Sequence, residues 1–284
     1  MVLKIAIQKS GRLHDDSIQL LKDCGIAVKN GNNQLKTVAD NFPLEAYFLR
    51  DDDIPQYVED NVAHIGIVGE NVLFEKNKSV DVVEQLGFGK CRLSIAVQKN
   101  EQYNDANYLQ GKKIATSYPE LTRQFLHANK IQAEIHEISG SVELAPGIGL
   151  ADAICDLVSS GSTLFMNGLK EVQTILKSQA VLVRSKQLAP GEQSLLDQLL
   201  FRIRAVKKAQ NNKYVLLNAP NDSLEKIISL LPGMKSPTVL PLAETGWSSV
   251  HSVLNEDEFW EKIEALKNAG AQGILVIPIE KMII

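Results

Sequence analysis

The sequence predicts an α/β protein with two sheet-and-helix lobes joined by a hinge, followed by a smaller ferredoxin-like domain. Three observations indicate this fold class. Short apolar runs typical of buried strands alternate with amphipathic helices in the first part of the chain, which favours mostly parallel sheets. Polar clusters follow several of these runs, at the strand ends where such sheets bind ligands. The last part of the chain follows the order β-α-β-β-α-β.

The first lobe is expected to contain strands at three apolar runs, residues 3–7, 44–49 and 64–69. Asp15 or Asp16 is expected to cap the helix after the first strand, and Gly25 to end it. A second helix is expected to open at Asp53, because Pro55 fits the first turn of a helix.

The second lobe is predicted to begin near Gly87 and Gly89, where the glycine content rises. Strands are expected at residues 92–97 and 112–116, a helix at 118–126, and the strands that return to the first lobe within 172–184. The predicted domain limits are residues 1–89 and 178–192 for the first lobe, 90–177 for the second and 193–284 for the third domain.

The third domain is predicted to start with a helix over residues 193–208, which has an apolar stripe. Asp222 and Glu225 resemble a capping box for its second helix, and Asn255 with Glu258 predicts a cap for its third, which Gly270 ends. Four strands complete the domain, at residues 213–217, 238–242, 250–254 and 273–279.

Composition excludes several classes of protein. The chain has 284 residues, 44% hydrophobic and 23% charged, as in ordinary globular proteins. A net charge of −4 provides no basic field for nucleic acid or anionic lipid. No run approaches the roughly twenty apolar residues of a membrane span, and the N-terminal run is too short for a signal peptide, so a cytoplasmic location is expected. The three cysteines lack CxxC spacing and are expected to be free thiols.

The stretch from Glu143 to Thr163 carries the clearest site signal. Asp152 and Asp156 are spaced to share one face of a strand and suit a ribose diol or a ligand-borne metal ion. A turn rich in hydroxyls and backbone N–H groups follows, which suits a phosphate: Ser159, Ser160, Gly161, Ser162 and Thr163. The alternative is an ordinary strand and turn with solvated acids, since isolated Ser-Gly turns are common.

A second candidate site lies in the turn after the first strand, which contains Lys9, Ser10, Gly11 and Arg12. Lysine and arginine together suit a polyphosphate, although an exposed basic turn explains them equally well. Arg50 at a strand end is a further phosphate candidate, whereas at least one of the three acids after it is expected to be a solvated helix cap. Glu70 is expected either to contact ribose or adenine or merely to cap a helix.

Other catalytic motifs are missing from the sequence. It contains no GxxxxGK[ST] loop, HExxH or GxSxG motif, and Gly147 and Gly149 lack the third glycine of a dinucleotide loop. A P-loop enzyme and a nicotinamide-dependent dehydrogenase are therefore poor fits.

The central stretch resembles the signature of the ATP phosphoribosyltransferase family, which acts first in histidine biosynthesis. The matching residues are Glu143, Gly149, Ala151, Ile154, Asp156, Leu157, Ser160, Gly161, Thr163 and Leu164. Five other segments agree with the family, residues 8–13, 50–55, 66–70, 115–119 and 278–282. The resemblance therefore runs essentially from end to end and is to the long form of these enzymes.

The resemblance implies a two-lobed catalytic core like the type II periplasmic binding proteins, and transfer of 5-phosphoribosyl from phosphoribosyl pyrophosphate to N1 of ATP, with Mg²⁺. On this basis Ser159–Thr163 are expected to hold the 5-phosphate, and Asp152 and Asp156 to lie near the ribose. Lys9, Arg12 and Arg50 are expected to face pyrophosphate or triphosphate.

The resemblance also implies that the third domain is an ACT-like regulatory domain, which binds histidine as an inhibitor within a homohexamer, with a dimer possible. Asn218 and Thr238 match the family's effector pocket, although some relatives carry an acid at the position of Asn218. The alternative function is a two-lobed binding or sensor protein without catalysis, which the strand–helix alternation alone permits.

Overall fold

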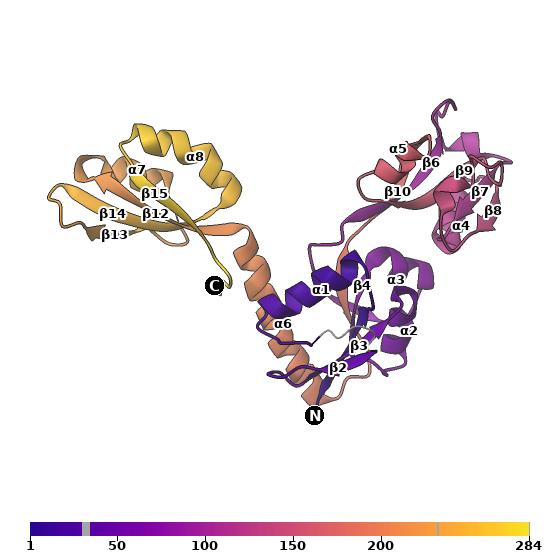
Figure 1. The fold of residues 1–284 in the computed structure, drawn as a ribbon, viewed down its shortest axis with the longest axis horizontal. Coiled ribbons are helices and arrows are strands. Elements are labelled where there is room, and N and C mark those ends of the chain that lie inside the picture. Colours follow the sequence, from indigo (N-terminus) through magenta and orange to yellow (C-terminus); the bar gives the residue numbers. More distant parts are fainter. Residues whose placement is uncertain (30–34, 232, 284) are drawn as a thin grey trace. The chain divides into compact units, whose positions relative to one another are not determined.

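The structure, a computed structural model, describes residues 1–29, 35–231 and 233–283. The chain divides into two compact units, Met1–Asp197 and Gln198–Ile284 (Figure 1). The first unit contains two sheets and the second contains one. Across the described ranges, no helix is both long enough and apolar enough to span a bilayer.

The first lobe is built on a six-stranded sheet with the order β2-β3-β1-β4-β11-β5. The neighbours β1–β3 and β1–β4 are parallel, whereas β2, β11 and β5 pair antiparallel. Its strands are β1 (Leu3–Gln8), β2 (Lys36–Val38), β3 (Leu44–Leu49), β4 (Ile65–Gly69), β5 (Asp81–Gln85) and β11 (Ala180–Arg184). Its helices are α1 (Arg12–Asp23), the 3-10 turn η1 (Asp51–Asp53), α2 (Ile54–Glu59) and α3 (Glu70–Lys76).

The second lobe has a five-stranded sheet with the order β10-β6-β9-β7-β8 and a helix against each face. Leu121 and Leu126 of α4 pack in one core cluster, and Leu164 of α5 packs in the other. The strands are β6 (Cys91–Gln98), β7 (Lys113–Thr116), β8 (Glu134–Glu137), β9 (Ala153–Val158) and β10 (Leu169–Ser178). The helices are η2 (Ala106–Leu109), α4 (Pro119–Ala128), η3 (Val142–Leu144) and α5 (Ser162–Met166).

The chain crosses between the two sheets twice, through the segment that joins β5 to β6 and through Gln179, which joins β10 to β11. The two-stranded hinge expected from the sequence is therefore present. The crossings bring the ends of β6 and β10 beside the carboxyl ends of the first lobe's strands, which is where the candidate site lies.

The second unit begins at Gln198, inside the long helix α6 (Pro190–Gln210), and the predicted domain boundary at residue 193 also falls within this helix. Its sheet has the ferredoxin-like order β13-β14-β12-β15 and is antiparallel throughout. Helices α7 and α8 cover one face, where Ile227 and Phe259 join the core (Figure 1). The elements are β12 (Asn212–Pro220), η4 (Asn221–Ser223), α7 (Leu224–Leu230), β13 (Thr238–Pro241), β14 (Trp247–Asn255), α8 (Glu256–Asn268) and β15 (Gln272–Pro278).

Two predicted helix caps are wrong. Helix α1 begins at Arg12, because Gly11, with φ of 91°, turns the chain directly into the helix, and Asp15 lies in the first turn. No side chain caps α7 either, because the predicted cap Asp222 lies inside the 3-10 turn that precedes this helix. The cap at Asn255 is confirmed, because its side chain accepts a hydrogen bond from the Asp257 N–H.

Three edge strands, β2, β5 and β8, were not predicted from the sequence. They are short, and most of their side chains are exposed or only half-buried. A strand of this kind leaves no apolar run, so only its pairing with a neighbouring strand reveals it.

Candidate active site

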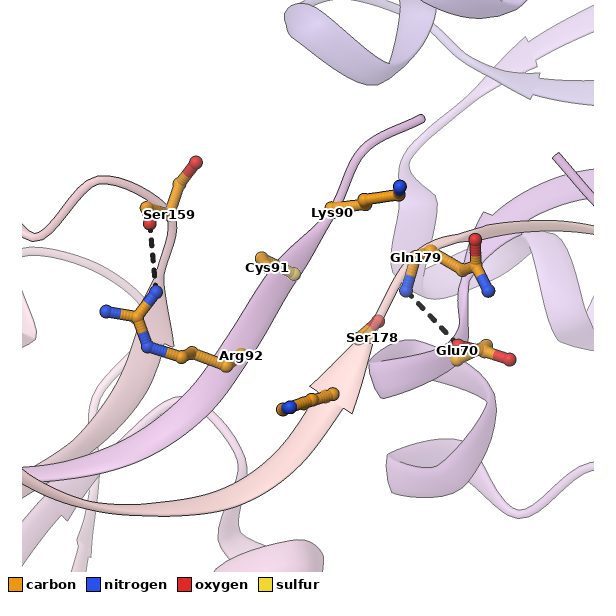
Figure 2. A pocket seen from close by; sticks show the side chains of 8 residues that line it. Glu70, Lys90, Cys91, Arg92, Ser159, Ser178 and Gln179 are labelled. Carbon is orange, nitrogen blue, oxygen red and sulfur yellow. Dashed lines mark hydrogen bonds between the residues drawn. The ribbon is translucent and has the colours of Figure 1, made fainter. Parts of the chain in front are cut away.

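Two adjoining cavities, of about 510 and 210 Å³, lie between the two lobes. They share Lys90, Cys91 and Ser159 in their walls. The larger is also lined by Glu70, Arg92, Lys177, Ser178 and Gln179 (Figure 2). The smaller one reaches into the first lobe, where Gln8, Arg12, Asp51, Gly69 and Asn71 contribute. A cleft between lobes, lined by cationic and hydroxyl groups, is suited to a phosphorylated small molecule.

The basic turn after β1 contributes Arg12 to this cleft. The backbone N–H of Lys9 continues the β1–β3 pairing by donating to the Leu49 carbonyl at 2.8 Å, which fixes where the turn begins. Lys9, Ser10 and Gly11 are exposed beside it. The Arg12 side chain is 74% exposed, and its Nε lies 3.9 Å from the Asp16 carboxylate, so the guanidinium remains accessible to an anion.

The acidic segment after Arg50 contains three side chains in different environments. Asp51 lines the smaller cavity, and burial together with the neighbouring Asp52 raises the pKa of its carboxyl. Asp52 lies 3.7 Å from Lys76, and Asp53 occupies the N-cap position of α2. Arg50 itself is exposed at the end of β3. Asp51 is thus the acid of this segment that faces the cleft.

Glu70, the first residue of α3, lines the larger cavity. Its carboxylate accepts hydrogen bonds from the Gln179 backbone N–H at 3.2 Å and from the Gln85 side chain at 3.3 Å. Figure 2 shows the first of these contacts across the hinge. Glu70 therefore ties the start of α3 to the returning hinge strand.

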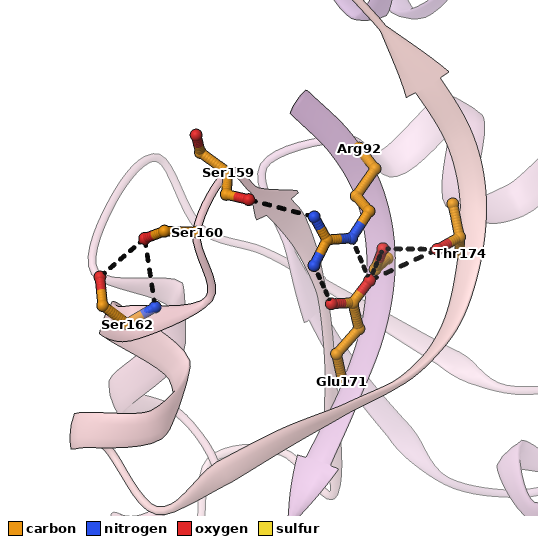
Figure 3. A network of polar contacts seen from close by, with 7 residues as sticks. Arg92, Ser159, Ser160, Ser162, Glu171 and Thr174 are labelled. Atoms are coloured by element: carbon orange, nitrogen blue, oxygen red, sulfur yellow. Dashed lines mark hydrogen bonds and ion pairs between the residues drawn. The ribbon is translucent and has the colours of Figure 1, made fainter. Parts of the chain in front are cut away.

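The hydroxyl-rich turn connects β9 to α5 and lies at the carboxyl end of β9. Gly161 takes the left-handed conformation, with φ of 81°, and precedes the first helical residue. The Ser160 and Ser162 hydroxyls lie 2.9 Å apart, and the Ser160 oxygen also accepts from the Ser162 N–H (Figure 3). Ser159 lines both cavities, while Ser160 to Thr163 are exposed or half-buried beside it and do not line either one.

Arg92 holds the turn against the sheet of the second lobe. Its Nη1 donates to the Ser159 carbonyl at 3.1 Å, and its other guanidinium nitrogens pair with the Glu171 carboxylate (Figure 3). Arg92 lowers the pKa of the Glu171 carboxyl, which also accepts from the Ser94 hydroxyl at 2.8 Å. This bidentate pair orients the guanidinium and so fixes the position of Ser159.

The two acids of the central stretch occupy different places: Asp152 precedes β9, and Asp156 lies within it. Asp156 is half-buried, its carboxylate accepts from the Leu157 N–H, and burial together with the neighbouring Glu143 raises its pKa. Asp152 precedes the strand, is exposed and accepts from the Lys113 N–H at 2.8 Å. A spacing of four positions along an extended strand separates the two acids by roughly 13 Å. Asp156 therefore lies nearer than Asp152 to the turn at Ser159, but neither acid lines either cavity.

No cluster of three potential metal-binding side chains occurs within residues 1–29, 35–231 and 233–283. The charge of Glu143 acts on the Asp156 carboxyl, but two carboxylates are too few to hold a divalent ion by themselves. Such a pair suits a hydrated ion that arrives with its own phosphate ligands.

The two predicted effector residues lie on the sheet face of the second unit that is opposite α7 and α8. Asn218 pairs with Ser249, and Thr238 pairs with His251, so β14 separates them. The His251 ring bonds to the Tyr214 hydroxyl at 2.6 Å and to the Ser249 hydroxyl at 2.9 Å. Polar side chains therefore lie beside both residues, and the exposed Leu240, which pairs with Ser249, shares this face.

The residues that sequence reasoning missed are those of the hinge: Lys90, Arg92, Lys177, Ser178 and Gln179. A signal for them existed, because Lys90 and Arg92 follow the glycine pair predicted as the crossover. The two strands that join lobes must border any cleft between them.

Known proteins are similar to this chain over its whole length. The family model described as ATP phosphoribosyltransferase matches residues 50–205, and the model described as HisG, C-terminal domain, matches residues 209–281. The ATP phosphoribosyltransferase of Cytophaga hutchinsonii is 59% identical over 99% of both chains. That of Bacteroides thetaiotaomicron is 54% identical over 100% of both.

Solved structures agree with these matches. The ATP phosphoribosyl transferase (HisG:HisZ) complex from Thermotoga maritima has a TM-score of 0.61 and 28% identity, over 72% of this chain and 99% of that one. The structure of Tv2483 bound to L-arginine has a TM-score of 0.51 at 13% identity, over 73% of this chain and 85% of that one, and so shares the fold alone.

Proposed function

The chain belongs to the ATP phosphoribosyltransferase family, pentosyltransferases of histidine biosynthesis, and from this premise we propose how its residues perform the reaction. The cleft between the lobes binds phosphoribosyl pyrophosphate and ATP. N1 of the adenine attacks the anomeric carbon, the bond from that carbon to pyrophosphate breaks, and the configuration inverts. The observation that carries the proposal is a cavity with Arg12 from one lobe and Ser159 from the other in its walls.

The reaction requires alignment more than proton transfer. Adenine N1 already carries a lone pair, so no base has to deprotonate it before attack. The protein must hold nucleophile, anomeric carbon and leaving group in line, and must stabilise the charge that builds on pyrophosphate. Rigid walls on two lobes suit the first task, and cationic side chains suit the second.

The turn from Ser159 to Thr163 binds the 5-phosphate in this proposal. Its backbone N–H groups and hydroxyls are donors, and Gly161 has no Cβ to obstruct a ligand. Arg92 positions the turn through the Ser159 carbonyl rather than by contacting phosphate, because Glu171 already occupies its guanidinium. Ser160, Ser162 and Thr163 are accessible from solvent, as a phosphate subsite at the rim of the cleft requires.

Asp156 hydrogen-bonds to the ribose hydroxyls. Its burial raises the cost of keeping a bare carboxylate, and two hydroxyl donors from a sugar would offset that cost. Lys9, Arg12 and Arg50 face pyrophosphate or triphosphate on the first lobe, where their exposed cationic ends are available. Lys90 and Lys177 of the hinge add positive charge to the same cavity. Glu70 stays a ribose or adenine candidate because it lines the larger cavity.

The enzymes of this family use a metal ion in catalysis, and we propose Mg²⁺ for this chain. The carboxylates of Asp156 and Glu143, whose charges interact, would suit an ion bound chiefly by substrate phosphates and water. When bound, the ion would neutralise part of the charge on the leaving pyrophosphate.

The second unit is proposed to bind histidine as a feedback inhibitor on the sheet face that carries Asn218 and Thr238. The assembly proposed is a homohexamer, with a dimer as its smaller form, in the cytoplasm, where both phosphorylated substrates are available. Sedimentation velocity with and without histidine tests the assembly. The proposal predicts a shift toward the larger species when histidine is added.

The activity is tested by mixing the protein with ATP, phosphoribosyl pyrophosphate and Mg²⁺ and following absorbance at roughly 290 nm, where the N1 adduct is expected to absorb. Absorbance should rise only when both substrates are present, and histidine should slow the rise. A binding or sensor protein of the same fold would bind a ligand without any rise. That outcome would refute the catalytic proposal.

A further inference from the structure

The helix α3 of the first lobe holds the beginning of helix α4 in the second lobe. The Glu75 carboxylate accepts hydrogen bonds from the backbone N–H groups of Glu120 at 2.9 Å and Leu121 at 3.0 Å. These N–H groups lie in the first turn of α4, where a helix has no partners of its own for them. A carboxylate there also complements the positive end of the helix dipole. The cap of α4 is thus supplied by the other lobe.

A second contact joins the same two helices. The Asn71 side-chain amide donates to the hydroxyl of Tyr118, the N-cap residue of α4, at 3.1 Å. Asn71 is 4% exposed and is fixed by Ser178, whose hydroxyl donates to its side-chain oxygen at 2.8 Å and accepts from its backbone N–H at 3.0 Å. Ser178 ends β10 at the hinge. The contact therefore links first lobe, hinge and second lobe.

The sequence leaves room for this arrangement. A Cβ built on Gly69 would lie 2.3 Å from the Asn71 side-chain oxygen, so only glycine fits beside the folded-back amide. Both Gly69 and Asn71 line the smaller cavity. Three interactions and one glycine thus converge on the seam next to the cleft.

We propose that Glu75 is a positioning residue that sets the opening of the substrate cleft. The proposal rests on the proposed function, in which phosphoribosyl pyrophosphate contacts Arg12 on one lobe and the turn at Ser159 on the other. The affinity for such a ligand depends on the separation of the two walls. With the cap of α4 in place, the lobes are held ready for the substrate, and less binding energy is used to arrange them.

The test uses the full chain and measures two quantities, the Kd of phosphoribosyl pyrophosphate by calorimetry and the steady-state constants. Glu75→Ala is expected to raise Kd and KM about tenfold, because the competent arrangement becomes a minor one, and to leave kcat within about twofold. Glu75→Gln retains one acceptor oxygen, so its Kd and KM should lie between those of the wild type and those of Glu75→Ala. Tyr118→Phe should act in the same direction, and its combination with Glu75→Ala should raise KM less than the product of the single effects.

Glu59→Ala is the matched control. Glu59 is also half-buried in the first lobe, and its carboxylate accepts from the Ser79 backbone N–H at 2.7 Å, but this contact stays within the lobe. It should lower the unfolding temperature as Glu75→Ala does, without changing Kd or KM.

Two results would overturn the inference. One is an unchanged Kd in Glu75→Ala, and the other is an equal rise in Glu59→Ala, which would indicate a general loss of stability. A wild-type protein without transferase activity would instead refute the proposed function, and the calorimetric Kd would still report on Glu75.

Discussion

At the level of single residues, Asp156 and Asp152 are the same type of residue in different surroundings. Burial raises the pKa of the Asp156 carboxyl. Asp152 is exposed just before the strand, and its carboxylate accepts a hydrogen bond from the Lys113 N–H. Asp156 is half-buried, and no cation pairs with it among the described residues, so its carboxylate suits a ligand-binding role. The hydrogen bond from the Lys113 N–H gives Asp152 a structural role instead.

Asp156→Asn is expected to lower kcat/KM by roughly tenfold to a hundredfold, because it removes the charged acceptor for the ribose. The free energy of unfolding should not fall, since a buried carboxylate with a raised pKa is costly to keep ionised and the amide oxygen can still accept from the Leu157 N–H. Kinetics and thermal melts measure both. Asp152→Asn should leave kcat/KM close to the wild-type value, and an equal loss in both variants would contradict the distinction.

Gly161 allows a second comparison between residues of one kind. Gly161 and Gly111 both lie in turns of the second lobe with positive φ, 81° and 73°. A Cβ would meet only Val158 at 3.8 Å in the first case and no atom within 4 Å in the second, so alanine costs backbone strain alone at either position.

We expect Gly161→Ala and Gly111→Ala to destabilise the protein similarly, by about 1 kcal/mol each. Only Gly161→Ala should raise the KM for phosphoribosyl pyrophosphate, because it reshapes the proposed phosphate turn. Denaturant unfolding and initial rates provide the two readouts. A KM that changes equally in both variants would argue against a phosphate role for the turn.

At the level of elements, His64 joins three of them in the first unit. It lies at the start of β4, its Nδ1 accepts from the Lys4 N–H of β1 at 3.1 Å, and its Nε2 lies 3.2 Å from the Glu192 carboxylate of α6. The accepting Nδ1 requires the neutral ring with the proton on Nε2. Burial lowers the pKa of His64 below 6.5, and the charge of Lys4 acts in the same direction, against the opposing effect of Glu192.

This lowered pKa makes the free energy of unfolding depend on pH. The unfolded chain binds the proton more readily, so the contribution of His64 is complete above pH 6.5 and is lost as the pH falls through the lower folded-state pKa. Calorimetric melts should therefore show the free energy of unfolding decreasing as the pH falls from 6.5 toward the folded-state pKa of His64. His64→Asn, whose side-chain oxygen can replace Nδ1 as acceptor, should reduce this slope. An unchanged slope would assign the pH dependence to other groups.

At the level of the whole molecule, the proposed catalytic site and the proposed effector site lie in different compact units. The cavity is formed by residues of the first unit, and Asn218 and Thr238 belong to the second. Coupling between two such sites requires that histidine prefer one state of the assembly over another. A variant in the second unit should therefore change inhibition without changing catalysis.

Thr238→Ala is expected to weaken histidine inhibition several-fold by removing a hydroxyl from the sheet face that carries Asn218, while kcat and KM without histidine stay the same. Ser229→Ala in the same unit is the control, because the Ser229 hydroxyl bonds only locally, to the Lys226 carbonyl, on the helical side. Inhibition curves measure the effect. Equal inhibition of wild type and Thr238→Ala would move the effector site elsewhere.

Much of the fold could be predicted from the local sequence pattern. The apolar runs at residues 3–7, 44–49 and 92–97 lie within observed strands, and the β-α-β-β-α-β order of the third domain is confirmed by its sheet. Periodicity and turn residues suffice for elements whose side chains are buried. They do not suffice for edge strands such as β8, because an exposed strand has no pattern that a loop could not share.

The family and the composition of the turn from Ser159 to Thr163 can both be read from the amino-acid sequence, because each matching segment consists of residues adjacent in the chain. The support of this turn by Arg92, and the cap that Glu75 supplies to a helix in the other lobe, become visible only in the folded chain. The contacts from Glu75 to α4 span 45 and 46 residues, and the contact from Asn71 to Ser178 spans 107. Side chains so distant in sequence meet only after the two sheets have formed and the hinge has placed them together.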